Sequence, residues 1–284
     1  MKALIQHNFS SGLGDCIVAI YEYLETSQKL KKIGYEIELI LNIQNNVYLY
    51  EENFFDLFNK KVFKHFSKIT FVNTPIHQTI HNDLTRVYTL SNASPGQHWW
   101  DLFINNPINF NYEWLSIYPY QDSKTPNNIK IFNKKIYEEY NIIKTKYDLN
   151  TPFNSIYFRT YDYVDESELY IKYEKTISEI IESSDKIFIC SNSSKIKDKI
   201  KNLGDNKIIS YNIPYENEIG NHWTGKKPIM SPIELFERTK YTIFDMLTLS
   251  DSINISHISE WSRTSNFLIF SKIQNKQIIP YYDF

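Results

Sequence analysis

Apolar and polar residues along the N-terminal part of the chain follow first the period of a strand and then that of a helix. A short apolar stretch, Lys2–Gln6, predicts a strand, and an amphipathic stretch, Cys16–Ile33, predicts a helix after a Ser-Ser-Gly-Leu-Gly-Asp turn. We expect Gly34 to end this helix. Apolar stretches at Ile37–Asn42 and Lys68–Val72 predict two further strands.

The second half of the chain repeats this alternation more regularly. Strands are expected at Ser155–Phe158, Lys186–Cys190, Lys207–Ser210 and Ser252–Ser256, and helices at Tyr170–Ser183, Ser194–Leu203, Ser231–Arg238 or beyond and Ser262–Lys272. Strands that alternate with helices favour a parallel sheet covered by helices on its faces. The pattern therefore predicts an α/β protein of two Rossmann-like domains, residues 1–145 and 146–284.

Composition narrows the class of protein and of partner. Hydrophobic residues make up 42% of the 284 residues and aromatic residues 16%, which is typical of chains that fold around real cores. The formal net charge is only −2 and no basic cluster is present, so the chain lacks the one-signed field of a protein that binds nucleic acid or anionic lipid. A small or carbohydrate partner fits this charge better.

The N-terminal residues predict the cellular location of the protein, and the surroundings of its two cysteines predict their redox state. The first 20 residues are polar where a signal peptide needs an apolar segment, and no apolar run approaches the length of about 20 residues that spans a membrane. We therefore expect a cytoplasmic protein. Cys16 and Cys190 are expected to be buried reduced thiols, and the seven histidines show no metal-ligand spacing, so no metal is expected.

The first candidate for chemistry is the turn Gly12-Leu13-Gly14-Asp15, between the first strand and its helix. Two glycines let the backbone bring N–H groups close to a ligand at a helix N-terminus. A turn capped by Asp15, without a ligand, is the alternative. The turn lacks the third glycine of the dinucleotide fingerprint and the lysine of a P-loop, which argues against a dehydrogenase or a nucleoside triphosphatase.

Polar side chains also follow three expected strands of the second half, at the ends where ligands of open α/β sheets bind. Arg159 follows Ser-Ile-Tyr-Phe, and its guanidinium suits two phosphate oxygens, although an ion pair with Asp162 or Asp165 is the alternative. Cys190–Ser194 offers hydroxyl and amide groups, with Ser194 as a helix N-cap in the simpler reading. Trp261–Ser265 offers hydroxyls and Arg263 where a helix is expected to begin.

Taken in order, these stretches resemble the fucosyltransferase superfamily that uses GDP-fucose, which includes nodulation-type, core α1,6 and protein O-fucosyltransferases. The stretches that carry the resemblance are Gly12–Asp15, Tyr157–Asp162, Ser191–Ser193, Asp245–Ser250 and Ser259–Ser265. Tyr157 stands where the superfamily has a histidine, Asn192 stands where it has an acid, and a second arginine of some members is absent.

The resemblance implies a GT-B architecture, in which two Rossmann-like domains face a central cleft, and metal-independent inverting transfer of fucose from GDP-fucose to a glycan or another hydroxyl acceptor. It implies no resident cofactor, because GDP-sugar is a co-substrate. Arg159 would contact the β-phosphate and help catalysis; further donor-binding residues would be Gly12, Gly14, Ser191, Asn192, Asp245, Ser262, Arg263, Thr264 and Ser265.

The acceptor side and the general base are less defined by the sequence. Asp15 is the candidate base that we name, with His7, His98 and His222 as alternatives, and His222 and Trp223 are the candidate acceptor contacts. Two other functions remain open: a GT-B transferase with another donor such as ADP-heptose, whose family also opens with a G-x-G-D type turn, and a carbohydrate-binding derivative without activity.

Overall fold

The protein forms two compact units that each contain a sheet. The computed structural model describes residues 2–8, 12–32, 34–43, 46, 48–72, 88–89, 115–116, 129–160, 165–211, 230–259 and 265–282. The N-terminal unit comprises Met1–Asn133 and Gly220–Pro232, and the C-terminal unit comprises Lys134–Ile219 and Ile233–Phe284.

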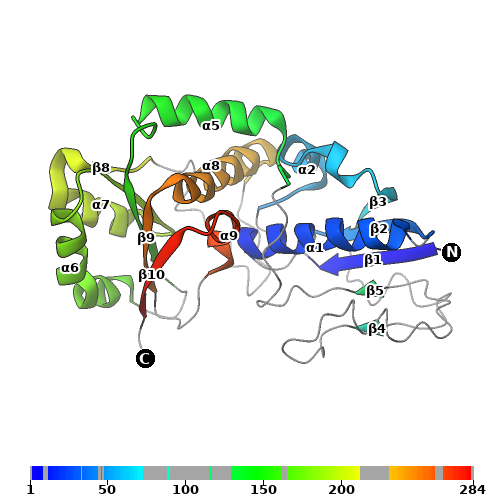
Figure 1. Cartoon of the computed structure of the whole chain (residues 1–284), viewed down its shortest axis with the longest axis horizontal. Helices are drawn as coiled ribbons and strands as arrows, with labels where there is room; N and C mark the ends of the chain where they lie inside the picture. The colour runs from blue at the N-terminus through cyan, green and yellow to red at the C-terminus, as the bar shows by residue number, and fades with distance from the viewer. Residues whose placement is uncertain are drawn as a thin grey trace. The chain divides into compact units, whose positions relative to one another are not determined.

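The described strands of the N-terminal unit form a five-stranded sheet in the order β3-β2-β1-β5-β4. Every pairing in it is parallel, which confirms the predicted sheet type (Figure 1). The strands are β1 (Lys2–Asn8), β2 (Glu36–Asn42), β3 (Phe66–Val72), β4 (Tyr88–Thr89) and β5 (Leu115–Ser116). The chain places β2 and then β3 on one side of β1; on the other side β4 lies at the sheet edge and the later strand β5 lies between β4 and β1.

Helix α1 (Leu13–Lys32) connects β1 to β2 and ends as the sequence predicts. Gly34 adopts a φ of 88°, a left-handed conformation that glycine tolerates best. Its N–H donates to Lys31 O and the N–H of Tyr35 donates to Leu30 O, the bond pair of a Schellman cap. Two shorter helical segments, α2 (Glu51–Leu57) and η1 (Lys60–Phe63), follow β2.

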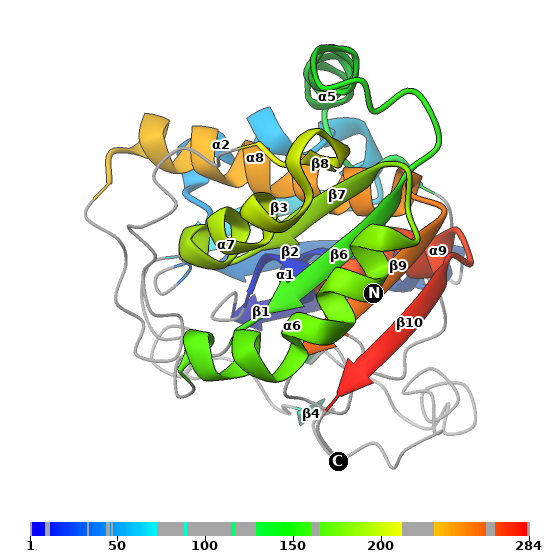
Figure 2. The ribbon, with the colours of Figure 1, turned by 90° about the vertical axis from the view of Figure 1, so that its left-hand side faces the viewer.

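The C-terminal unit contains a second parallel five-stranded sheet, in the order β10-β9-β6-β7-β8 (Figure 2). Its strands are β6 (Asn154–Arg159), β7 (Ile187–Ser191), β8 (Ile208–Ile209), β9 (Asn254–Ser259) and β10 (Gln277–Tyr282). The chain lays down β6, β7 and β8 in one direction and then returns to place β9 on the other side of β6. This is the doubly wound topology that the alternating pattern predicts.

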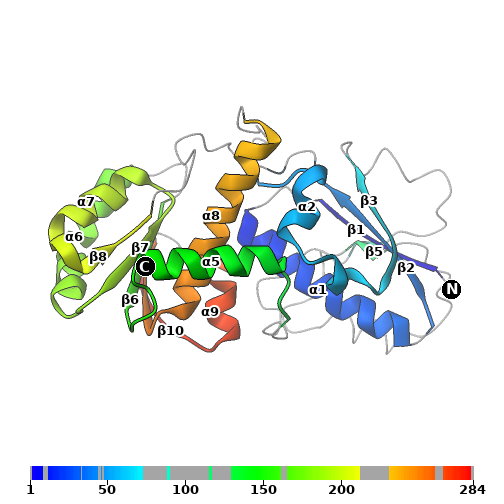
Figure 3. The same ribbon diagram turned by 90° about the horizontal axis from the view of Figure 1, so that it is seen from above.

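Helices cover both faces of this sheet. Helices α6 (Glu166–Glu182) and α7 (Ser194–Gly204) lie on one face, and α8 (Pro232–Asp251) and α9 (Ile269–Ile273) lie on the other (Figures 2 and 3). The remaining helices of the unit are α5 (Lys134–Lys146), η3 (Asp205–Lys207) and η4 (Asn266–Leu268). The predicted domain boundary after residue 145 falls at the end of α5 and stays a prediction.

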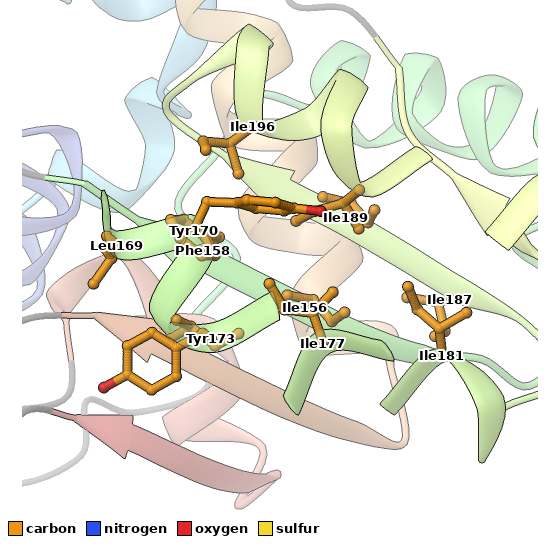
Figure 4. Packing of buried hydrophobic residues seen from close by; sticks show 12 residues of the cluster. Ile156, Phe158, Leu169, Tyr170, Tyr173, Ile177, Ile181, Ile187, Ile189 and Ile196 are labelled. Atoms are coloured by element: carbon orange, nitrogen blue, oxygen red, sulfur yellow. The ribbon is translucent and has the colours of Figure 1, made fainter. Parts of the chain in front are cut away.

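The face under α6 and α7 is apolar and rich in isoleucine. Ile156 and Phe158 of β6, with Ile187 and Ile189 of β7, pack against one side of α6, including Ile177 (Figure 4). Successive strand residues point to opposite faces, so Tyr157, Arg159 and Cys190 must point to the face under α8 and α9. The more polar side chains of β6 and β7 therefore lie on the face of the sheet that α8 and α9 cover.

The helix expected at Ser231–Arg238 or beyond is α8, which begins at Pro232 and does continue, to Asp251. Other predicted bounds in this unit are wrong: the helix expected at Ser262–Lys272 is the short η4 followed by α9. The strand expected at Ser252–Ser256 begins at Asn254 and continues to Ser259. Neither α5 nor β10 was expected; Pro280 in β10 is tolerated because this strand lies at the sheet edge.

Helix α5 is joined to the end of α8 by a small polar cluster, which provides a test of the packing. The Tyr140 hydroxyl donates to Asp251 Oδ2 at 2.8 Å, and Lys144 Nζ reaches the same oxygen at 2.7 Å. We expect Asp251→Asn to lower the free energy of unfolding by about 1 kcal/mol, because two partners lose a charged acceptor. Urea unfolding measures this; Glu138→Gln, in the exposed pair with Lys134, is the control and should change it by less than about 0.5 kcal/mol.

Candidate functional site

The candidate site lies where the order of strands reverses in the C-terminal sheet. Strands β6 and β9 are neighbours in the sheet but are separated in the chain by β7 and β8. The loops that leave two such strands diverge to opposite faces, and ligands of doubly wound sheets bind in the crevice at their carboxyl ends. Any ligand of this sheet is therefore expected beside the last residues of β6 and β9.

Arg159 occupies this point of the sheet. It is the last residue of β6, it pairs with Ser259, the last residue of β9, and it is half-buried. Ser259 is buried. The prediction that a guanidinium stands at a strand end is confirmed, and the strand end is the one next to the reversal.

The Asn192 side chain binds the residue that follows Arg159. Its Oδ1 accepts a hydrogen bond from the Thr160 N–H at 2.9 Å, and its Nδ2 donates to the Thr160 carbonyl at 3.0 Å. Thr160 is buried. Asn192 thus joins the carboxyl end of β7 to the carboxyl end of β6, and its predicted contact with the nucleoside stays a prediction.

The turn from β7 into α7 is built from serine hydroxyls. Ser191 Oγ accepts from the Ser193 N–H at 3.1 Å, and Ser193 Oγ accepts from the Ile196 N–H at 3.3 Å. Ser193 therefore caps α7, and the prediction of Ser194 as the N-cap is wrong by one residue because Ser194 is already helical. Ser191 is buried at the end of β7.

Three aromatic rings lie below the candidate site. Tyr157 and His257 are register partners on β6 and β9, and their rings stack with centroids 5.0 Å apart and planes 17° apart. Phe267 of η4 stacks on the same tyrosine, at 5.1 Å and 13°. Ser265, a predicted phosphate contact, caps η4 by accepting a hydrogen bond from the Phe267 N–H at 3.2 Å. The stack therefore fixes η4 on the β6–β9 pair.

His257 is held neutral in this position. Its side chain is 0% exposed, and burial lowers its pKa to about 4, with the positive charges of Lys272 and Arg159 as the lesser causes. Both cations are thus close enough to the imidazole to act on it. Two positive charges, on Arg159 and Lys272, therefore lie near this strand pair, and such charges suit an anionic ligand.

Asp245 lies in the middle of α8 and faces the sheet. It is 2% exposed, and the Cys190 thiol points to its Oδ2 at 3.5 Å. Burial and the charge of Asp245 raise the pKa of the neighbouring Tyr211 hydroxyl well above its usual value. Asp245 is therefore beside Cys190, the residue before Ser191, which is also a predicted donor contact. The contact of Asp245 with a nucleoside stays a prediction. Cys16 and Cys190 are buried free thiols, as expected.

The glycine turn occupies the equivalent place in the N-terminal unit. It follows β1, which is next to the reversal between β1 and β5. Helix α1 begins at Leu13, so Gly14 and Asp15 are in its first turn rather than before it, and Asp15 is not the N-cap. The Asp15 carboxylate stands near Gly12, since a Cβ on that glycine would lie 3.8 Å from Asp15 Oδ2. An acid in a first turn is favourable because the helix dipole is positive there.

Several predicted contacts lie outside the described residues: Ser262, Arg263, Thr264, His222, Trp223 and the alternative base His98. His7, another alternative base, lies in β1. Sequence reasoning missed His257, Phe267 and Lys272. The strand expected at Ser252–Ser256 stopped one residue short of His257, and Phe267 and Lys272 fall within the helix expected at Ser262–Lys272, where no motif marked them. Among the described residues, no group of three or more His, Cys, Asp or Glu is arranged to hold a metal ion.

Comparison with known proteins identifies the fold. No protein-family model matches the sequence, and no curated protein matches it. A NodZ fucosyltransferase from Bradyrhizobium superposes with a TM-score of 0.59 at 12% identity, over 96% of this chain and 92% of that chain. The chain has the fold of the NodZ fucosyltransferases.

Two further NodZ structures give the same result. A NodZ α-1,6-fucosyltransferase soaked with GDP-fucose has a TM-score of 0.56 at 14% identity, over 96% of this chain and 93% of that one. The same kind of enzyme co-crystallised with GDP has a TM-score of 0.55 at 12% identity, over 96% and 92%. The NodZ fold confirms, at the level of fold, the resemblance seen in the sequence motifs. No helix in the described part of the chain combines the length and apolar character of a membrane span.

Proposed function

We propose that the protein is a glycosyltransferase of GT-B architecture that moves fucose from GDP-fucose to a hydroxyl group of a glycan or another acceptor. The observation that carries the proposal is the position of Arg159, at the end of β6 beside the strand reversal, in a chain with the NodZ fold. NodZ structures have been obtained with GDP and with GDP-fucose, which supports the same donor here.

In the proposed reaction, an acceptor oxygen forms a bond to the anomeric carbon of the sugar while the bond from that carbon to the diphosphate oxygen breaks. GDP leaves with the bonding electrons, so negative charge grows on its β-phosphate. A guanidinium stabilises this charge through paired hydrogen bonds, and we assign the role to Arg159. Lys272 and Arg159 both contribute to lowering the pKa of His257, so two positive charges lie near this strand pair, which supports the role.

The other donor and acceptor roles are proposed for the residues that the sequence motifs assign to them. Ser191 and Asp245 would adjoin the nucleoside and Ser265 the phosphates, and Gly12 and Gly14 are proposed as further donor contacts. Asp15 is the proposed base for the acceptor hydroxyl, whose proton it would take as the new bond forms. We further propose inversion at the anomeric carbon without a bound metal, and acceptor contacts from His222 and Trp223.

A thermal-shift screen tests the donor. We expect GDP to raise the melting temperature more than UDP or ADP at equal concentration, because a ligand that binds only the folded state stabilises it by RT ln(1 + [L]/Kd), about 1.4 kcal/mol at tenfold excess over Kd. Larger protection by ADP would instead favour a transferase with a donor such as ADP-heptose. Equal shifts with all three nucleotides, or none, would contradict the GDP-fucose proposal.

A further inference from the structure

We infer that Asn192 is a positioning residue, whose side-chain amide fixes the backbone beside Arg159 and thereby sets the place of the guanidinium. This inference rests on the proposed function and deepens it, because it moves Asn192 from a contact with the nucleoside to a role exerted through Arg159. It is carried by the two hydrogen bonds between Asn192 and Thr160.

The amide continues the pairing of β6 with β7 beyond the point where their backbones stop pairing. The last register pair of these strands is Phe158 with Ser191. One residue beyond the end of β7, the Asn192 side chain both accepts from the Thr160 N–H and donates to the Thr160 carbonyl. A single side chain therefore satisfies both backbone groups of a buried residue, which would each be costly to leave unbonded.

Arg159 is held from both sides as a result. On one side its backbone pairs with Ser259 of β9, the last register pair of those strands. On the other side, the next residue is bound to Asn192. The peptide that carries the guanidinium is thus fixed between β7 and β9, and loss of Asn192 would release it on the β7 side. Displacements of about 1 Å at a positioning group are sufficient to lower catalysis about 100-fold.

The chemistry of the clamp requires an amide rather than the acid that the related motif carries at this position. An aspartate could accept from the Thr160 N–H but could not donate to the Thr160 carbonyl. Its negative charge would stand beside that carbonyl oxygen and one residue from Arg159, where the proposed ligand is a diphosphate. The same residue in amide form donates, accepts and carries no charge.

The test compares GDP affinity, measured by isothermal titration calorimetry, in four variants. We expect Asn192→Ala and Asn192→Asp each to raise the Kd for GDP at least about tenfold. In an Arg159→Ala background, Asn192→Ala should change the Kd by less than about twofold, because a residue that acts through Arg159 has no further effect once Arg159 is gone. Asn192→Asp keeps the size and shape of the side chain, so it remains informative if the alanine variant does not fold.

Asn154→Asp is the matched control. Asn154 is the first residue of the same strand, and its amide likewise donates, to Ser184 Oγ at 3.0 Å, and accepts, from Asn254 Nδ2 at 3.3 Å. Because Asn154 makes similar hydrogen bonds, Asn154→Asp should lose about as much stability in urea as Asn192→Asp. Because Asn154 lies at the opposite end of β6 from Arg159, the GDP affinity of Asn154→Asp should stay unchanged.

The outcomes separate the inference from the proposed function. Unchanged GDP affinity in both Asn192 variants would overturn the inference alone, as would an equal loss on Asn192→Ala with and without Arg159. Absence of GDP binding by the unaltered chain would overturn the proposed function and the inference with it. Faster hydrogen exchange at the Thr160 amide in Asn192→Ala, together with the tenfold loss of affinity, would support the clamp.

Discussion

Replacing Arg159 with alanine is expected to lower the rate of sugar transfer by about 100-fold or more, because the charge that grows on the departing diphosphate loses its paired donors. The fold should survive, since Arg159 ends a strand and is only half-buried. Release of GDP from GDP-fucose in the presence of acceptor gives the rate, and far-ultraviolet circular dichroism with urea unfolding reports on the fold.

Two further variants show whether the effect belongs to this position. Arg159→Lys keeps the charge but loses the planar fork, so we expect a rate between those of the alanine variant and the unaltered chain. Lys199→Ala removes another cation of the unit, one that lies on α7 over the Tyr170 ring, on the opposite face of the sheet. It should leave the rate unchanged. Full activity in Arg159→Ala would show that the assignment of this motif is wrong.

The aliphatic part of the C-terminal unit was predictable because its signal is local. Strand β6 was expected at Ser155–Phe158 and extends from Asn154 to Arg159, and β7 was expected one residue early. Apolar runs of this length, bounded by polar residues, are typical of strands buried on both faces. Gly34 likewise marks the end of α1, since only its backbone conformation is needed there.

The polar part could not be predicted in the same way, because its residues are buried by partners that are distant in the chain. The strand β9 was expected to end at Ser256, yet His257 follows in the strand and is buried against Tyr157, 100 residues earlier. Asn192 was correctly placed at a strand end, but its partner is Thr160, which directly follows another strand, β6. Pattern indicates which residues are polar at strand ends; only the register between strands shows which of them contact one another.

The same buried histidine predicts how stability depends on pH. The pKa of His257 is about 4 in the folded protein, against about 6.5 in an unfolded chain. Between these values the unfolded chain binds a proton that the folded protein does not, so stability is fully present above pH 6.5 and is lost as pH falls toward 4. The difference of about 2.5 pKa units corresponds to at most about 3 kcal/mol. Urea unfolding at pH 7 and at pH 4.5 measures the loss.

Other acidic groups also titrate in this range, so the effect of His257 must be isolated by substitution. His257→Phe keeps an aromatic ring on Tyr157 and cannot take a proton, and we expect its stability to fall less steeply between pH 6.5 and 4.5 than that of the unaltered chain. His65→Gln, at a half-buried histidine of the N-terminal unit, should follow the unaltered chain more closely. Arg159→Ala removes one of the positive charges that lower the pKa of His257, so the pKa of His257 in the folded protein should rise. The loss of stability should then end at a higher pH and be smaller. Parallel curves for His257→Phe and the unaltered chain would mean that the pKa of His257 is the same in the folded and the unfolded chain. That result would contradict the lowering of this pKa by burial and by the charges of Lys272 and Arg159.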